Sequence, residues 1–351
     1  MELPCGTFNE TYEQDKAIFR RRTHWIWFIA AMIVLAVLPL FTSAHFDTVL
    51  ITIAITIITV MGLNILIGYA GQISIGQSGF MAVGAYTSAI LATKFGLPFW
   101  VTLLCGGIMA AAVGVLFALP AAKIKGFYIV LATIAAQFII VYVIMHNPWG
   151  LTGGYAGLDA PPPRLGSITL DSPRSYYYLA LGICAIMTFF AVNWSRTRLG
   201  RAFVAIRDNE FAAETLGINL FQHKLIAFAI CSFYAGIAGG LWGHFTGRVS
   251  PDAYTLMTSV WYVGILVVGG IGSTMGVIYG CIVYQLLQEM VAATAPAIAG
   301  SFPGIAAGIF AGLGQLLFGI IIMVVLVVEP RGLNHAWGVL KTRYRLWPYS
   351  Y

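Results

Sequence analysis

The most constraining feature of the sequence is a succession of apolar segments, each close to the length that crosses a lipid bilayer. A bilayer core requires about 20 apolar residues per helix, with a working range of about 17–25. Charged residues make up only 9% of the 351 residues, whereas a soluble domain carries about 25%. The sequence therefore predicts an all-α integral membrane protein with about ten transmembrane helices. The ten candidate segments are 25–41, 49–68, 80–93, 99–119, 126–145, 176–193, 225–246, 254–270, 276–292 and 304–328.

The basic residues predict how these helices are oriented. Cytoplasmic connections of membrane proteins carry an excess of lysine and arginine. With the N-terminus inside, fifteen of the nineteen basic residues fall on the cytoplasmic side and four on the other. We therefore expect a cytoplasmic N-terminal tail (1–24), a transmembrane domain (25–328) and a cytoplasmic C-terminal tail (329–351). Two connections are long: an external loop at 146–175, which a triple proline should stiffen, and a cytoplasmic loop at 194–224.

Residues 68–86 (GYAGQISIGQSGFMAVGAY) form the most distinctive segment within the predicted membrane region. Its glycines interrupt helical regularity, and irregular backbone is tolerated at that depth only where protein buries it or it lines a wet cavity. We expect a broken or re-entrant segment, followed by a helix that restarts near Phe80 and directs its positive end toward a carboxylate. Close packing of small residues between helices is the alternative. The polar side chains assigned to a substrate pathway are Gln72, Ser74, Gln77 and Ser78.

The cytoplasmic loop contains a short helix with recognisable end signals. Asp208 or Asn209 suits the N-cap, Glu210 complements the positive end, and Gly217 suits the left-handed closing position. Exposed apolar area on so short a helix indicates a partner, and a helix lying on the membrane surface is the alternative. The side chains at helical spacing are Phe211, Ala212, Thr215 and Leu216.

Motifs for catalysis and for ion coupling are missing from the sequence. The glycine-rich segment at 269–276 (GGIGSTMG) lacks the lysine of a phosphate-binding loop, and the five scattered cysteines show no metal-ligand spacing. The net charge of +6 follows from orientation and does not indicate nucleic acid. Glu289 alone lies clearly inside a predicted span, which is thin support for an ion-driven secondary transporter. A passive channel is also disfavoured, because no ring of charges or carbonyls is apparent.

Four sequence blocks resemble the permease subunits of ABC importers for branched-chain amino acids, specifically the longer of the two paired permeases. The resemblance covers roughly residues 25–335. Its blocks are NILIGYAGQISIGQSGFMAVGAY (64–86), GRAFVAIRDNEFAAETLGIN (200–219), VVGGIGSTMGVIYG (267–280) and EPRGL (329–333).

The resemblance implies that the short cytoplasmic helix docks on an ATPase subunit. The general pattern of such coupling helices is Glu-Ala-Ala, three residues, then Gly; here Ala212, Ala213 and Gly217 match, while Phe211 replaces the Glu. The coupling residues implied in this way are Arg207, Asp208, Asn209, Glu210, Ala212, Ala213 and Gly217.

The resemblance also implies the partners and the location. It implies a second, shorter permease, two ATP-binding subunits and a soluble substrate-binding protein, in a bacterial cytoplasmic (inner) membrane with both termini cytoplasmic. No cofactor is expected on this chain, since ATP and Mg belong to the partner ATPases, and the chain itself is not an enzyme. Urea, short amides or aromatic acids remain alternative cargoes, because similar permeases carry them.

Overall fold

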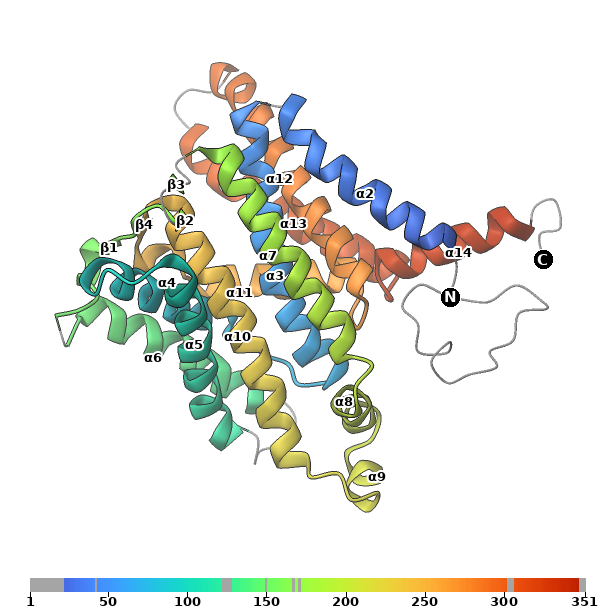
Figure 1. Ribbon diagram of the computed structural model, residues 1–351. Coiled ribbons are helices and arrows are strands. Elements are labelled where there is room, and N and C mark those ends of the chain that lie inside the picture. The colour runs from blue at the N-terminus through green and yellow to red at the C-terminus, as the bar shows by residue number, and fades with distance from the viewer. Residues whose placement is uncertain are drawn as a thin grey trace.

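The chain forms a bundle of long helices with two distinct ends (Figure 1). Short strands and loops cover one end, here called the strand end, and two short helices, α8 and α9, project from the other, here called the α9 end. The computed structural model describes residues 22–41, 43–121, 128–148, 150–165, 168–169, 172–301 and 306–346.

The described elements are almost all helical. The helices are α2 (Arg22–Phe41), α3 (Ala44–Leu63), α4 (Gln77–Lys94), α5 (Phe99–Ala121), α6 (Tyr128–His146), α7 (Pro173–Trp194), α8 (Arg198–Asp208), α9 (Glu210–Thr215), α10 (Leu220–Thr246), α11 (Leu256–Gly269), α12 (Thr274–Ser301), α13 (Ala306–Val328) and α14 (Leu333–Leu346). The shorter elements are the π-helical turn η1 (Asn64–Tyr69), the 3-10 turns η2 (Gly154–Ala156) and η3 (Pro251–Ala253), and the strands β1 (Leu158–Asp159), β2 (Arg164–Leu165), β3 (Ile168–Thr169) and β4 (Arg248–Val249).

These elements confirm the predicted all-α membrane fold. Each of the ten apolar segments overlaps one long helix. By length and composition, seven helical stretches among the described residues could cross a membrane. The helices α13 and α14, which meet at a bend of 47°, would supply an eighth if they are one span. The 18-residue helix α4 does not reach that standard, in keeping with the shortness of segment 80–93.

Side-chain caps fix where several helices begin. The first N–H groups of a helix have no partner within the helix. Ser172 accepts a hydrogen bond from the amide of Ser175 (3.2 Å) at the start of α7, just before Pro173. Asn219 accepts one from the amide of Gln222 (3.1 Å) at the start of α10. The local sequence therefore sets both starting points before any tertiary contact is made.

The helix α10 is the centre of the bundle and packs against α3, α4 and α5. Glycines allow these backbones to approach closely. A Cβ added to Gly84 of α4 would overlap the backbone of Gly236 on α10, and one added to Gly106 of α5 would lie 2.7 Å from the carbonyl oxygen of Gly84. The helices α4, α5 and α10 thus meet backbone to backbone at this level.

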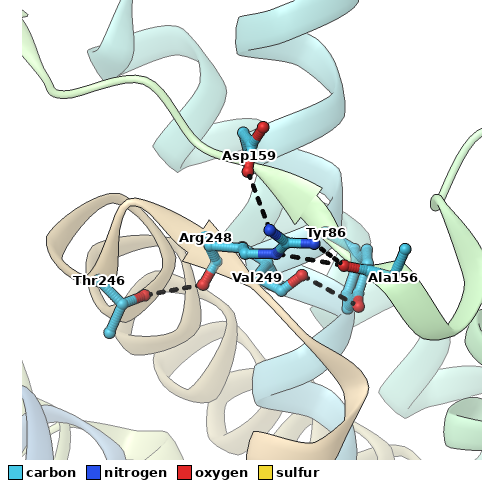
Figure 2. Close-up of polar contacts among 6 residues, drawn as sticks. All are labelled: Tyr86, Ala156, Asp159, Thr246, Arg248 and Val249. Carbon is cyan, nitrogen blue, oxygen red and sulfur yellow. Dashed lines mark hydrogen bonds and ion pairs between the residues drawn. The ribbon is translucent and has the colours of Figure 1, made fainter.

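The long connection before α7 is folded against the strand end, as its prolines predicted. Strand β1 pairs antiparallel with β4, so that Asp159 lies opposite Arg248. Figure 2 shows Arg248 donating to the carbonyl oxygen of Ala156 (Nε to oxygen, 3.2 Å) and facing the Asp159 carboxylate at 4.0 Å. The Tyr86 hydroxyl of α4 donates to the carbonyl oxygen of Val249 (3.3 Å). These contacts hold the loop to α4 and to the end of α10.

Replacing Gly84 with alanine tests the contact between α4 and α10. Gly84→Ala should destabilise the protein by roughly 1–3 kcal/mol, since overpacking a tight contact forces the backbones apart. Gly182→Ala in α7 is the matched control, because its Cβ would meet nothing within 4 Å and alanine favours helix by about 1 kcal/mol over glycine. Thermal unfolding in detergent should show a lower Tm for Gly84→Ala alone; equal Tm values for the two variants would contradict the packing described.

Candidate functional site

The predicted break in the second span is present and begins near the α9 end. The helix α3 continues as the π-helical turn η1, and residues 70–76 are non-helical before α4 starts at Gln77. The turn out of η1 uses Gly71, whose φ of +68° suits glycine. The helix therefore restarts three residues before the predicted position at Phe80.

The non-helical segment runs from the α9 end into the interior of the bundle. At its far end, Gln77 donates from Nε2 to the carbonyl oxygen of Thr59 (3.0 Å) and accepts from Sγ of Cys231 (3.1 Å). Cys231 lies 11 residues from the start of α10, about 16 Å at a rise of about 1.5 Å per residue, and Thr59 lies 10 residues before the end of η1. Gln77 thus joins α3, α4 and α10 well inside the bundle.

All four side chains assigned to a pathway are buried. Gln72 is 5% exposed and Ser74, Gln77 and Ser78 are fully buried. Gln72 donates to the carbonyl oxygen of Ala70 (3.2 Å), and Ser74 accepts from the amide of Gly76 (3.4 Å). Their polar groups are thus enclosed by protein in this conformation.

Side chains from two other helices satisfy the amide groups at the start of α4. The Ser259 hydroxyl of α11 accepts from the amide of Ser78 (2.9 Å), and Oε1 of Gln137 on α6 accepts from the amide of Gly79. The Ser259 hydroxyl also donates to Gln137 Oε1 (3.3 Å), and Gln137 Nε2 donates to the carbonyl oxygen of Tyr254 (2.9 Å). We expected the N-terminal end of α4 to be open toward a carboxylate. In this structure, side chains of the protein occupy its amide groups instead.

Sequence reasoning missed Gln137 and Ser259, although a signal for the first was available. Gln137 is the single amide in the apolar helix α6 (YIVLATIAAQFIIVYVIMH). A polar residue in such a segment needs a partner, because a buried polar group without one is costly. Its partner lies 58 residues away in the chain, which periodicity alone does not reveal.

Some polar atoms around the break have no hydrogen-bond partner within the described structure. Among them are Oε1 of Gln72 and Oγ of Ser78, both buried. Leaving such a group unsatisfied costs about 1–3 kcal/mol. Two of the four assigned pathway residues therefore retain hydrogen-bonding capacity that this conformation does not use.

The short helix in the long connection at 194–224 forms as its sequence predicted. Asn209, rather than Asp208, is its N-cap and accepts from the amide of Ala212 (3.1 Å), and Gly217 follows it with a φ of +82°. Phe211 is 71% and Leu216 80% exposed. Large apolar side chains thus project from α9 into solvent.

Ala213 lies on the opposite side of α9, and its side chain is only 1% exposed. It faces its own chain, so that a bulky replacement there would displace α9 itself. Glu210 at the start of α9 pairs with Lys224 of α10, at 2.7 Å between Oε1 and Nζ. Lys224 is 3% exposed, and a buried ammonium requires such a partner. The helix α9 is thereby fixed to α10.

Arg207 links the end of α8 to the broken helix. Its guanidinium donates from one terminal nitrogen to the carbonyl oxygen of Gly68 in η1 (2.8 Å), and the other pairs with Asp208 at 3.0 Å. A Cβ on Gly71 would lie 2.9 Å from Arg207 Cγ. Arg207 therefore points inward, toward η1, and not outward along the surface of α9.

A second turn contacts η1 at the same place, and a third turn packs on the second. The amide of Gly272, between α11 and α12, donates to Oδ1 of Asn64 (2.8 Å). A Cβ on Gly332, in the turn before α14, would lie 2.5 Å from the Cα of Gly270. We call the contact of η1, Arg207, the 270–273 turn and the 329–332 turn the junction.

The carboxylate predicted inside a span lies at the surface of this structure. Glu289 pairs with His45 at 3.0 Å, and their side chains are 32% and 75% exposed. In the part of the chain that the structure describes, no group of three or more His, Cys, Asp or Glu residues is placed to hold a metal ion.

The fold and the site together define a multi-pass helical membrane protein of the transport type, in which a buried broken helix is joined to a helix outside the bundle. The sequence profile of the branched-chain amino acid transport system permease component matches residues 45–326. The chain belongs to this family, as the four sequence blocks indicated, and family members are permeases rather than enzymes.

Individual relatives support this family assignment. The chain is similar to the high-affinity branched-chain amino acid transport system permease protein LivM of Escherichia coli, with 30% identity over 87% of this chain and 74% of the relative. A probable branched-chain amino acid permease of Methanocaldococcus jannaschii is 23% identical over 78% of this chain and 88% of its own length. The ribose import permease protein RbsC of Haemophilus influenzae is 26% identical over 75% and 83%. No solved structure matches the chain significantly.

Proposed function

We propose that this permease serves an ABC importer that carries branched-chain amino acids across a bacterial cytoplasmic (inner) membrane. The observation that carries the proposal is the family match over residues 45–326, together with similarity to branched-chain amino acid permeases over most of the chain. Its partners are a second permease, two ATP-binding subunits that hold ATP and Mg, and a soluble substrate-binding protein. Both termini and the α9 end face the cytoplasm, because most basic residues fall on that side.

In this proposal α9 is the coupling helix that docks on an ATPase subunit. The exposed Leu216 supports docking, since an apolar side chain on a projecting helix is typical of an interaction site. Glu210 and Ala213 secure α9 to its own chain, and Asn209 and Gly217 fix its ends. Asp208, which precedes α9, and Ala212, which lies within α9, are both exposed and complete the coupling segment.

Arg207 carries the motion inward. A displacement of α9 pulls on α10 through the Glu210–Lys224 pair and on η1 through the hydrogen bond to Gly68. The same segment of chain therefore connects the ATPase surface to the start of the broken helix. Alternating access follows if the ATP-driven movement of α9 changes the packing around η1.

The polar part of the pathway is assigned to Gln72, Ser74, Gln77 and Ser78. The buried atoms without partners, Gln72 Oε1 and Ser78 Oγ, support this assignment, because polar groups inside a membrane bundle are costly and are retained for function. Rearrangement of residues 70–76 would present these atoms to water or to substrate.

Purification and transport test the proposed function directly. We expect the chain, tagged in its native membrane and gently solubilised, to bring with it a second permease and ATP-binding subunits. Proteoliposomes of that assembly, with the soluble binding protein added, should take up leucine only when ATP is supplied. Uptake of urea, ribose or guanosine in preference to leucine would contradict the assignment of branched-chain amino acids as the cargo. Transport by the chain alone without ATP would contradict the whole proposal.

Leu216→Glu tests docking through α9. The exposed position leaves the fold intact, while a charge placed in an apolar contact should weaken recovery of the ATPase subunit at least tenfold, or about 1.4 kcal/mol. Leu216→Met is the control, since it keeps an apolar side chain of similar size and should retain the ATPase. Quantitative mass spectrometry measures how much ATPase subunit copurifies with each variant. Full recovery with Leu216→Glu would contradict the proposal that α9 docks on the ATPase.

Ser78→Ala tests the pathway without disturbing the fold, because Ser78 Oγ has no partner to lose in this conformation. Loss of a hydrogen bond to substrate or water should change KM or kcat for uptake about five- to tenfold. Ser232→Ala is the matched control. The Ser232 hydroxyl is also buried and without a partner, but it faces Gly114 of α5 rather than the broken segment. Uptake kinetics should change only with Ser78→Ala, and identical kinetics for both variants would refute the assignment.

A further inference from the structure

The helix α14 leaves the bundle at an angle and ends away from the other helices. It follows α13 after a bend of 47°. In Figure 1 it runs outward, across the direction of α7 rather than along it. The bend is held by an ion pair between Glu329 and His335 (2.7 Å) and by Gly332 at a φ of +82°. Leu333, the first residue of α14, packs against the core.

One face of α14 is apolar and exposed. With about 3.6 residues per turn, the side chains of Leu333, Trp337, Leu340 and Tyr344 fall in one stripe. Leu333 is partly buried, whereas Trp337 is 58%, Leu340 59% and Tyr344 85% exposed. Because the stripe begins at Leu333, which contacts the core, it lies on the side of α14 that faces the bundle.

Two basic residues border this stripe. Lys341 and Arg343 lie about 80° to either side of it on a helical wheel, and both are exposed. A recess of about 610 Å³ is lined by these residues and by the stripe: Trp337, Leu340, Lys341, Arg343 and Tyr344. The opposite face carries the exposed Thr342.

We propose that α14 lies in the membrane interface and binds the phosphate-bearing headgroups of anionic lipids. Aromatic side chains such as tryptophan and tyrosine favour that level of the bilayer, and long basic side chains extend from an apolar face toward headgroups. The exposed end of α13 at Val327 and Val328 continues the apolar surface toward the membrane. The positive borders of the stripe complement the negative surface of an anionic leaflet.

Hydrogen exchange of the full-length chain in nanodiscs tests this proposal. We expect amides 337–344 to exchange more slowly in nanodiscs of equal parts phosphatidylcholine and phosphatidylglycerol than in phosphatidylcholine alone. Each basic residue near an anionic surface contributes about a fivefold gain in binding, so the difference should approach about 30-fold. High salt should reduce it, because salt screens exposed charges.

Variants separate the charged and apolar parts. The double variant Lys341→Gln, Arg343→Gln should lose the difference between the two lipids, and Leu340→Glu should lose protection in both. Thr342→Glu adds the same negative charge as Leu340→Glu, but on the opposite face of α14. This variant should therefore be protected from exchange at least as well as the unchanged protein is in phosphatidylcholine nanodiscs.

Three outcomes would overturn the proposal. The first is exchange in the unchanged protein that does not differ between the two lipids. The second is a loss of protection in Thr342→Glu as large as that in Leu340→Glu. The third is protection that arises only when copurified partner subunits are present, which would assign the stripe to a protein surface.

Discussion

A helix that stops inside an apolar bundle leaves backbone N–H and carbonyl groups without partners, and water is excluded there. The break at residues 70–76 creates this demand, and three distant elements meet it. Thr133 of α6 accepts from the amide of Ile75, Gln137 and Ser259 satisfy the start of α4, and Arg207 donates to Gly68. The positions of α6, α11 and α8 around the break thus follow from hydrogen bonding that the broken helix cannot supply for itself.

The junction brings three distant parts of the chain together beside η1. Arg207 comes from the end of α8, the 270–273 turn from between α11 and α12, and the 329–332 turn from before the start of α14. Arg207 binds a backbone carbonyl of η1, the 270–273 turn binds the Asn64 side chain of η1, and the 329–332 turn packs on the 270–273 turn. A change in the register of η1 would therefore alter the contacts of Arg207 and of the 270–273 turn directly, and those of the 329–332 turn only through the 270–273 turn.

Local patterns predicted much of this structure. Apolar length located the ten helices α2 to α7 and α10 to α13, but not α14. The end signals of α9 were correct, with Asn209 chosen over Asp208 because its side chain reaches the Ala212 amide. The start of α4 was placed too late, since Gln77 and Ser78 look like loop residues until their partners on α3 and α11 are known. Partners so far apart in sequence cannot be found from one chain. The inward direction of Arg207 and the burial of Ala213 likewise depend on tertiary packing. The spacing of residues on a short helix does not show which side of it packs against the rest of the protein.

The close approach of Gly84 and Gly236 has a mechanical consequence. Where side chains interdigitate, one helix can slide past another by exchanging rotamers, but two backbones in direct contact have nothing to exchange. At this level α4, α5 and α10 are in direct backbone contact, and separating them would open a gap that no change of rotamer could fill. Because Lys224 ties α9 to the end of α10, a displacement of α9 would reach α4 and α5 through α10.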